Sequence, residues 1–247
     1  MTPTLQHPVL PINVLSSLLL LAGLVISLWY WSRGKRLSSD KLTIAFGGIV
    51  GAILGAKAGY FFAEVPIWWG EPMFWLRMLA GKTILGGLLG GWIGVVAAKR
   101  AVGEKQIMGD EFARILPLGI GIGRVSCMTH GCCSGRVVTE VLPEFLASHL
   151  QRLGFEFWPA ALVEIGFQLA FWLTCMATRN VSTLKGQQFH LYLISYGLFR
   201  AIHEHFRSTV RYSGTDFSPY MILGLFVAGA GAVAFVSRRR LRPSIPV

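Results

Sequence analysis

Charged side chains are scarce in this chain of 247 residues. Asp, Glu, Lys and Arg together make up 14% of it, and only 12 residues are acidic. Hydrophobic residues make up 53%, and the mean hydropathy is +0.54. A soluble domain needs more polar surface than this composition supplies, so the sequence predicts an integral membrane protein.

Cysteine is also rare, which excludes a disulfide-rich scaffold. The chain has four cysteines, three of them between positions 127 and 133. There is no low-complexity segment or internal repeat, and no loop is long enough for a soluble domain. No Lys or Arg precedes the first apolar run, which continues to spanning length, so we expect no cleavable signal peptide. A single domain over residues 1–247 is the simplest expectation.

Seven apolar stretches come close to the roughly 20 residues that a helix needs to cross a bilayer. They predict an all-α polytopic membrane protein with seven transmembrane helices. We expect these helices at 11–31, 43–63, 83–98, 112–128, 159–177, 188–206 and 219–237.

Lys and Arg are distributed unevenly between the two sides of these spans. Fourteen lie toward one side, six toward the other, and Lys57, Arg124 and Arg200 lie inside spans. The imbalance predicts an N-terminus outside and a cytoplasmic Arg238–Arg242 tail, with Trp68, Trp69 and Trp75 at the outer interface. Because topology accounts for the net charge of +11, we expect no nucleic-acid partner.

Glycine recurs every four residues in the second span and at similar spacing in the third. Small residues at this spacing let helix backbones approach closely, so we favour a packing role. Room for a lipid tail is the alternative, and the sequence leaves both interpretations open. The glycines are Gly47, Gly51, Gly55, Gly59, Gly86, Gly87, Gly90, Gly91 and Gly94.

The end of the sixth span carries a cluster of charged residues. Arg200, Glu204 and Arg207 stand at i, i+4 and i+7 and would share one helix face, with His203 beside it. Two arginines and one glutamate leave a net positive charge that suits a lipid phosphate. A structural salt bridge at a helix end is the alternative.

Three further charged residues lie within apolar segments. Arg124 would cost several kcal/mol in the fourth span without a partner. Glu164 begins the fifth span and can pair with an arginine, while Lys57 lies toward the outer end of the second. All of these charges fall in the outer half of the membrane. We therefore expect one polar cavity that binds an anion and opens outward.

A turn rich in cysteine follows Arg124. Cys127, His130, Cys132 and Cys133 can bind a soft metal, form a disulfide, or supply a nucleophile whose thiolate is favoured by nearby positive charge. Their spacing matches no standard zinc pattern. We favour a structural role and assign no metal ligand, while metal binding and nucleophilic catalysis stay open. Cys175 is expected to be a packed apolar residue.

The chain resembles the bacterial prolipoprotein diacylglyceryl transferases from the second span to the C-terminus. Gly51–Tyr60 is similar to the family's Gly-Ala-Arg-x-Gly-Tyr, with Lys57 in place of the arginine. Thr83–Gly90 resembles the segment that carries His-Gly-Gly. Gly123–Gly135 resembles the signature Gly-Arg-x-Gly-Asn-Phe-x-Asn-x-Glu-x-x-Gly. Gly186–Arg207 resembles the segment ending in Tyr-Gly-x-Phe-Arg-x-x-x-Glu-x-x-Arg and is the most specific match.

The resemblance implies a multi-pass enzyme of the bacterial cytoplasmic membrane that needs no cofactor. Such enzymes move the diacylglyceryl group of phosphatidylglycerol to the cysteine thiol of a prolipoprotein and release glycerol phosphate. Their partners are the lipid bilayer, phosphatidylglycerol and the prolipoprotein. By resemblance, the lipid headgroup would meet Arg124, Arg200, Glu204 and Arg207, with Lys57 also binding substrate and Gly135 closing the signature.

Some positions depart from the family pattern. Leu85 replaces the histidine of His-Gly-Gly, and Val163 replaces a tyrosine. Cys127 and His130 replace the signature's asparagines, and Cys132 replaces its glutamate. The chain therefore resembles a divergent, cysteine-rich branch. His130 and His203 are the candidate replacement bases.

Two functions from different classes compete. The first is a transferase that acts on a thiol acceptor. The second is a non-enzymatic membrane protein of the same fold that binds thiols or metal through the turn from Cys127 to Cys133. A transporter is a weaker third, because the sequence has no paired half-helices or repeats and its charges cluster toward one side.

Overall fold

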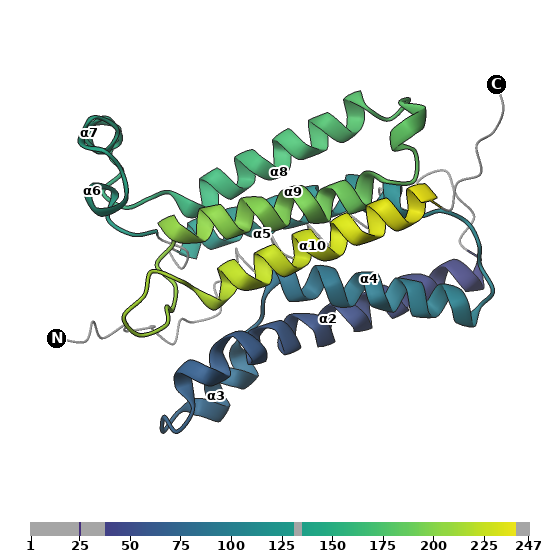
Figure 1. The fold of residues 1–247 in the computed structure, drawn as a ribbon, viewed down its shortest axis with the longest axis horizontal. Coiled ribbons are helices and arrows are strands. Elements are labelled where there is room, and N and C mark those ends of the chain that lie inside the picture. Colours follow the sequence, from purple (N-terminus) through teal and green to yellow (C-terminus); the bar gives the residue numbers. More distant parts are fainter. Residues whose placement is uncertain (1–24, 26–37, 131–134, 241–247) are drawn as a thin grey trace.

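The computed structural model describes residues 25, 38–130 and 135–240, and these residues form a bundle of helices (Figure 1). The first predicted span, 11–31, lies almost wholly outside the described residues. In chain order the helices are α2 (Ser39–Trp68), α3 (Phe74–Ala80), α4 (Ile84–Ala101), α5 (Gly109–His130), α6 (Val138–Val141), α7 (Glu144–Arg152), α8 (Ala160–Ala177), α9 (Gln188–His203) and α10 (Pro219–Arg240), with 3₁₀ turns η1 (Ser182–Leu184) and η2 (Glu204–Phe206).

Within the described residues, four helices are long and apolar enough to cross a membrane. They are α2, α4, α8 and the part of α10 from Pro219 to Arg238. The predicted spans 112–128 and 188–206 correspond to α5 and α9. These are helical and lie in the same bundle, but α9 has 16 residues, and α5 carries Asp110, Glu111, Arg114 and Arg124. The predicted all-helical membrane fold is confirmed, and the number of seven spans stays a prediction.

Glycine brings α2 and α4 into close contact. A Cβ added at Gly90 would lie 2.2 Å from the carbonyl oxygen of Gly51, and one added at Gly55 would lie 2.3 Å from that of Gly86. No side chain fits at such distances. The predicted packing role is therefore confirmed for the glycines of this contact.

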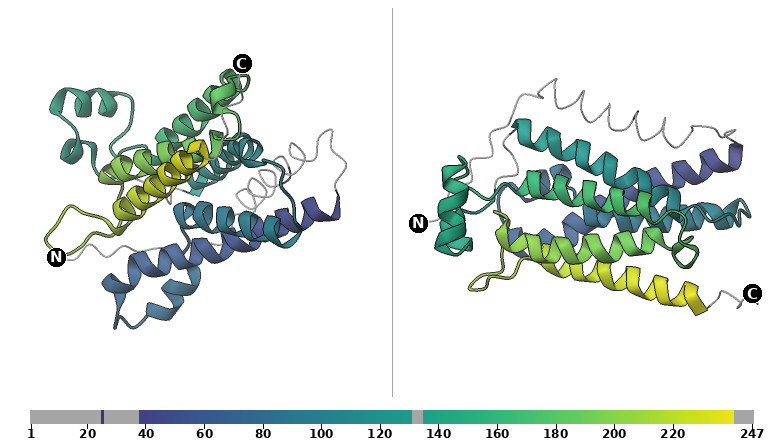
Figure 2. Two further views of the ribbon diagram at one scale, coloured as in Figure 1. Left: turned by 45° about the vertical axis from the view of Figure 1, so that its right-hand side comes forward. Right: turned by 90° about the horizontal axis from the view of Figure 1, so that it is seen from above.

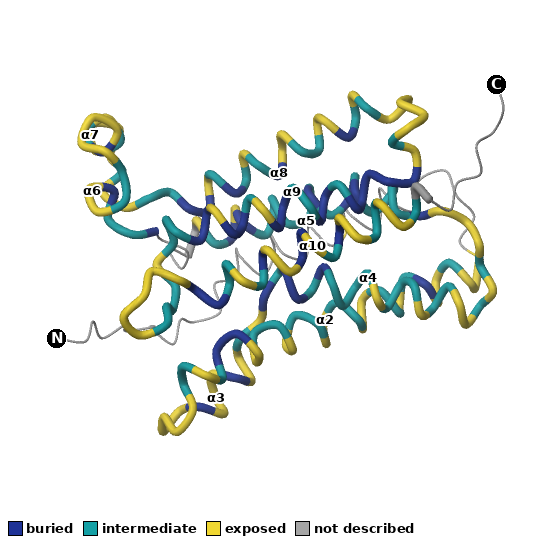
Figure 3. The backbone as a smooth tube through the Cα atoms, in the orientation of Figure 1, coloured by how far each residue is buried: buried dark blue, intermediate teal, exposed yellow. Residues whose placement is uncertain are grey.

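The most deeply buried helix is α9, as the dark blue segments of Figure 3 show. Tyr192, Leu193 and Tyr196 have no exposed surface, and they pack in one apolar cluster with Leu85 of α4 and Val227 of α10. Because α9 runs through the centre of the bundle, polar side chains at its ends are held against neighbouring helices.

The predicted helix 188–206 was wrong at its C-terminal end. The α-helix stops at His203, the 3₁₀ turn η2 follows, and Arg207 is extended with φ −89° and ψ 148°. The chain leaves the helix because the carbonyl oxygen of Phe206 accepts the N–H of Arg136 at 2.9 Å, and Arg207 forms a β-bridge with Gly135. Arg207 therefore does not lie on a helix face at i+7 from Arg200.

Short helices extend beyond the bundle at the end where α9 finishes. There α6 and α7 stand away from the long helices, and α3 folds back beside the C-terminal part of α2 (Figures 1 and 2). Phe145 of α7 and Trp75 of α3 are 71% and 69% exposed. Trp75 is one of the three tryptophans expected at the outer interface, and their place at that interface stays a prediction.

Candidate functional site

A buried carboxylate gathers three arginines at this end of the bundle. Glu164 of α8 is completely buried. Its Oε1 lies 3.0 Å from Nε of Arg124 on α5, and its Oε2 lies 3.1 Å from Nη1 of Arg200 on α9. Nη1 of Arg207, beyond η2, lies 3.5 Å from Oε2. The predicted pairing of Glu164 with an arginine is thus confirmed, and the structure extends it to three.

A second buried carboxylate completes the group. Oε2 of Glu204 accepts a hydrogen bond of 2.9 Å from Nη2 of Arg200 and lies 3.6 Å from Nε of Arg207. Arg124, Glu164, Arg200, Glu204 and Arg207 form what we call the ion-pair network. The side chains of its arginines are at most 13% exposed, and both glutamates are fully buried. Three positive and two negative charges leave one net positive charge.

Tyr196 contributes a hydrogen bond to the network. Its hydroxyl donates a 2.6 Å hydrogen bond to Oε1 of Glu164, one α-helical turn before Arg200 on α9. Oε1 of Glu164 therefore has partners on α5 and α9, and Oε2 has partners on α9 and on the extended segment after η2. Buried charges are stable only when paired and hydrogen-bonded in this way.

Besides Nε of Arg124 and Nε of Arg207, which lie at ion-pair distance from the carboxylates, three polar atoms in and beside the network have no hydrogen-bond partner among the described residues. They are Nε of Arg200, Nδ1 of His203 and Oε1 of Glu204, all buried. A buried polar group without a partner costs about 1–3 kcal/mol. The arrangement thus favours a ligand that supplies acceptors to the first two atoms and a donor to the third.

His203 is held in one tautomer by a tryptophan. The indole Nε1–H of Trp158 donates a 3.0 Å hydrogen bond to Nε2 of His203, and Phe199 stacks on the imidazole at 4.8 Å between ring centroids. Because indole nitrogen only donates, Nε2 accepts, and the ring proton of neutral His203 sits on Nδ1. A replacement base acting through Nε2 is therefore ruled out, and Nδ1–H is a donor.

A ladder of backbone hydrogen bonds holds the segment after the cysteine turn against the loop before α8 and against the end of η2. The N–H of Gly135 donates to the carbonyl of Trp158 at 3.0 Å, and Gly135 also bridges Arg207. A Cβ at Gly135 would lie 2.5 Å from Cβ of Trp158 and 2.7 Å from the carbonyl oxygen of Phe206. Gly135 is needed because two other backbones approach it.

A family model for prolipoprotein diacylglyceryl transferase matches residues 6–237, nearly the whole chain. The chain belongs to the prolipoprotein diacylglyceryl transferase family. The ion-pair network therefore lies in residues that this family match includes.

Individual relatives support the same family. The chain is 29% identical over 201 residues to a phosphatidylglycerol–prolipoprotein diacylglyceryl transferase of Pseudoalteromonas atlantica, covering 75% of this chain and 69% of that protein. It is 26% identical to the Klebsiella pneumoniae protein of the same name, covering 92% and 89%. With the Clostridium tetani protein of that name the identity is 28%, covering 83% of both.

Two positions at which the sequence is expected to depart from the family pattern lie apart from the ion-pair network. Lys57 is exposed on α2, and its Nζ donates to the carbonyl oxygen of Leu79 on α3. The structure therefore links Lys57 to α3 and does not bring it into the network. Leu85, which the resemblance aligns with a histidine, is 2% exposed and belongs to the apolar core.

The cysteine turn is only partly described. Helix α5 ends at His130, whose side chain lies outside the described part, as do Cys132 and Cys133. Sγ of Cys127 lies 3.7 Å from Nη1 of Arg124, which donates to it. No group of three or more His, Cys, Asp or Glu that could hold a metal occurs among the residues that are described. Cys175 is buried, as predicted.

Sequence reasoning missed two groups at this end of the transferase bundle. Trp158, which fixes His203, gives no local signal because it stands in a loop. The carboxylate of Glu64 on α2 accepts hydrogen bonds from Tyr60 and Trp68, both at 2.8 Å, and from Tyr220 of α10 at 2.5 Å. An acid four residues from each of two aromatic donors in an apolar helix is a signal that could have identified Glu64.

Proposed function

We propose that this chain transfers the diacylglyceryl group of phosphatidylglycerol to a cysteine thiol of a prolipoprotein. Family membership and the names of its relatives support this reaction. The structural observation that carries the proposal is the single net positive charge of the buried ion-pair network.

That charge matches the headgroup. The phosphodiester of phosphatidylglycerol carries one negative charge, so its arrival would neutralise the network. Its oxygens can accept from the unpartnered Nε–H of Arg200 and Nδ1–H of His203. Charge-assisted hydrogen bonds from a guanidinium to phosphate are among the stronger ones in proteins. Arg124 and Arg207 add positive charge on the other sides of Glu164.

The same arrangement suits nucleophilic displacement at the carbon of the diacylglycerol unit that is bonded to the phosphate oxygen. The sulfur of the acceptor cysteine forms a bond to this carbon. The carbon–oxygen bond breaks, and its electron pair leaves with glycerol phosphate. The arginines stabilise the charge on the departing phosphate. We assign Oε1 of Glu204 as the acceptor of the thiol proton, which then passes to the phosphate, so that a thioether and glycerol phosphate are the products.

The remaining site residues take supporting roles in this proposal. His203 is a donor to the phosphate, and Gly135 lets the ladder close behind the site. Lys57 and His130 stay sequence predictions, since Lys57 contacts Leu79 and the side chain of His130 is not described.

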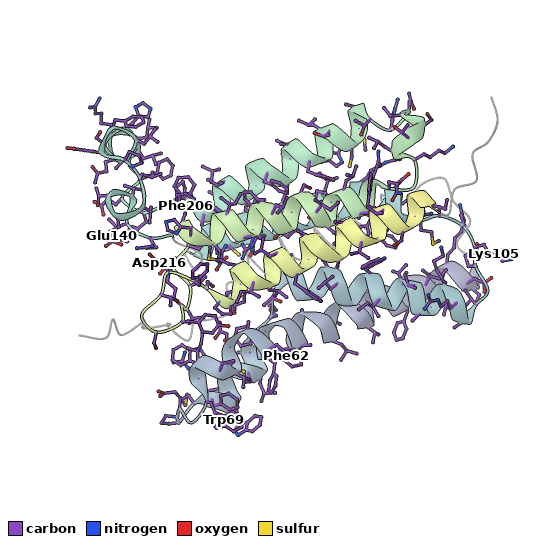
Figure 4. All side chains as sticks on the ribbon, in the orientation of Figure 1. Phe62, Trp69, Lys105, Glu140, Phe206 and Asp216 are labelled. Atoms are coloured by element: carbon purple, nitrogen blue, oxygen red, sulfur yellow. The ribbon has the colours of Figure 1, made fainter. Side chains whose placement is uncertain are left out.

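We further propose seven spans with the N-terminus outside, in the cytoplasmic membrane of a bacterium. The distribution of Lys and Arg supports this orientation. In Figure 4, Lys105 lies at one end of the bundle and Phe206 and Asp216 at the other, so the network faces the periplasmic side under this topology. The bacterial relatives support the location.

Mass spectrometry of a lipobox peptide tests the reaction. The purified chain is incubated with phosphatidylglycerol vesicles and a peptide containing the acceptor cysteine. We expect a mass gain of one diacylglyceryl group, abolished by Arg200→Ala and retained by Arg179→Ala, which removes an exposed arginine from the loop after α8. No adduct, while an active relative modifies the same peptide, would overturn the proposal in favour of a thiol or metal role for the cysteine turn.

A further inference from the structure

A cavity lies at the opposite end of the bundle from the ion-pair network. It has a volume of about 160 Å³ and lies between α2, α4, α5, α9 and α10. His190, which lines it, precedes Arg200 on α9 by ten residues, or about 15 Å along the helix axis. The cavity is therefore separate from the proposed transferase site.

Three basic side chains from three helices line one part of this cavity. They are Lys99 of α4, His190 of α9 and Arg238 of α10. Lys99 and Arg238 are close enough for their positive charges to act on each other, and Arg238 also acts on His190. No Asp or Glu is among the described residues that line it.

Carboxylates near these basic groups are already engaged by backbone. Asp110 accepts from the N–H groups of Gly186 and Gln188 at 2.5 and 3.1 Å, and Glu104 accepts from the N–H of Gln106 at 2.7 Å. Lys99 donates to the carbonyl oxygen of Gln106. Within the described residues, neither Lys99 nor Arg238 forms an ion pair. Glu104 acts on Lys99 and Asp110 on His190 from nearby, but neither carboxylate forms an ion pair with Lys99 or Arg238 among the described residues.

The hydrogen bonds of His190 leave one ring nitrogen for a ligand. Nε2 of Gln187 donates to the carbonyl of Phe235 at 3.1 Å, so the amide oxygen of Gln187 faces Nδ1 of His190 at 2.6 Å. Nδ1 thus donates, and Nε2, the nitrogen that remains for the cavity that His190 lines, is an acceptor that needs a donor from the ligand.

The rest of the cavity is apolar, and part of its lining is glycine. Trp92, Phe112 and Leu116 form its walls, and Gly87 and Gly91 line it from α4. An apolar cavity of about 150 Å³ takes up benzene in another protein. This one accommodates a stretch of hydrocarbon of similar size.

These two glycines differ from their neighbours on α4. At Gly86, Gly90 and Gly94 an added Cβ would meet backbone of α2 at 2.1–2.3 Å, so packing requires glycine there. At Gly87 and Gly91 the nearest atoms would be 3.5 and 3.4 Å away, an ordinary contact distance. Helix packing therefore does not require glycine at 87 and 91, where the missing side chains widen the cavity.

We propose that this cavity binds an anionic phospholipid with a hydroxylated headgroup, such as phosphatidylglycerol, with its phosphate at Lys99 and Arg238, a headgroup hydroxyl donating to Nε2 of His190, and part of an acyl chain against Gly87 and Gly91. Basic pockets between helices on the cytoplasmic side of a membrane bind anionic headgroups in this way. The ligand is a resident lipid of the opposite leaflet from the one that supplies the transferase substrate.

Native mass spectrometry of the full chain in mild detergent tests this proposal. Phosphatidylglycerol and phosphatidylcholine with matched acyl chains are the probes, and no thiol acceptor is present, so the result does not depend on transferase activity. We expect two bound phosphatidylglycerol molecules per wild-type chain, one of them lost in Arg200→Ala and the other in the Lys99→Ala/Arg238→Ala double variant. Phosphatidylcholine should not fill the second position.

Two matched substitutions separate the cavity from general surface charge. Lys99→Ala should lower occupancy of the second position about fivefold, whereas Arg100→Ala, which removes an exposed charge next to it, should change it less than twofold. Gly91→Leu should remove the same lipid without changing any charge. Each of these variants should still bind the other lipid, the one that Arg200→Ala loses. Its retention shows that the variant is folded.

Three results would overturn the proposal. Equal losses in Arg100→Ala and Lys99→Ala would indicate non-specific attraction to the surface. Retention of the second lipid in Gly91→Leu would show that the cavity does not hold the chain. Displacement of the lipid by millimolar glycerol phosphate would show that the site recognises a soluble anion.

Discussion

The indole of Trp158 and the imidazole of His203 are joined by a 3.0 Å hydrogen bond between residues 45 positions apart in the chain. Trp158 stands just before α8, and His203 is the last residue of α9. The bond holds the histidine ring beside the ion-pair network and commits Nε2 as an acceptor, so that Nδ1 presents a proton to the site.

Replacing this indole with Phe should release His203. Trp158→Phe keeps an aromatic ring against Phe206 but removes the donor, which we expect to cost about 1 kcal/mol of stability and about tenfold in kcat for diacylglyceryl transfer. Trp172→Phe is the matched control, because Nε1 of Trp172 has no hydrogen-bond partner in the described structure. Equal losses in both variants would contradict the role of the bond.

Arg200 should not tolerate lysine. Its Nη1 and Nη2 contact Glu164 and Glu204 at 3.1 and 2.9 Å, and a single ammonium cannot reproduce this forked geometry. We expect Arg200→Lys to lose at least 100-fold in kcat/KM, nearly as much as Arg200→Ala. The mass-spectrometric peptide assay measures both. A lysine variant within fivefold of wild type would show that only charge is needed.

Neutralising Glu164 should destabilise the fold. Glu164→Gln leaves three buried arginines with only the carboxylate of Glu204, and breaking a buried ion pair typically costs about 3–5 kcal/mol. Chemical unfolding in detergent measures the change. Glu144→Gln, at an exposed position at the start of α7, should have no measurable effect. Unchanged unfolding of Glu164→Gln would disprove the central place of this carboxylate.

Adding one methyl group at Gly135 should disrupt the backbone hydrogen bonds that hold this segment beside the ion-pair network. In Gly135→Ala the new Cβ would overlap Trp158, and overpacking of this kind costs about 1–3 kcal/mol. Gly166→Ala on α8 is the control, since no atom lies within 4 Å of an added Cβ there. Thermal unfolding compares the two. If both variants unfold at the same temperature, Gly135 is not needed sterically.

Much of the fold follows from local rules. The apolar stretches at 43–63, 83–98, 159–177 and 219–237 correspond to α2, α4, α8 and α10, because the length of an apolar run and helical periodicity are properties of neighbouring residues. Arg200 and Glu204 were expected together for the same reason. One helical turn separates them, and in the structure Nη2 of Arg200 lies 2.9 Å from Oε2 of Glu204.

Other features of the site depend on contacts between distant segments. The position of Arg207 results from strand-like pairing with Gly135, which ends the helix early. Lys57 contacts α3 because Leu79 offers a carbonyl nearby. Neither result follows from helical periodicity.

The amino-acid sequence by itself determined that this protein is a helical membrane protein of the prolipoprotein diacylglyceryl transferase family, with arginines placed inside apolar helices. Hydrophobic length and motif spacing are encoded along the chain and need no tertiary contact. Only the tertiary structure decided that Glu164 holds three arginines at once and that glycines on one helix serve two purposes. Both depend on the distance of closest approach between helices, which is set when the whole bundle packs.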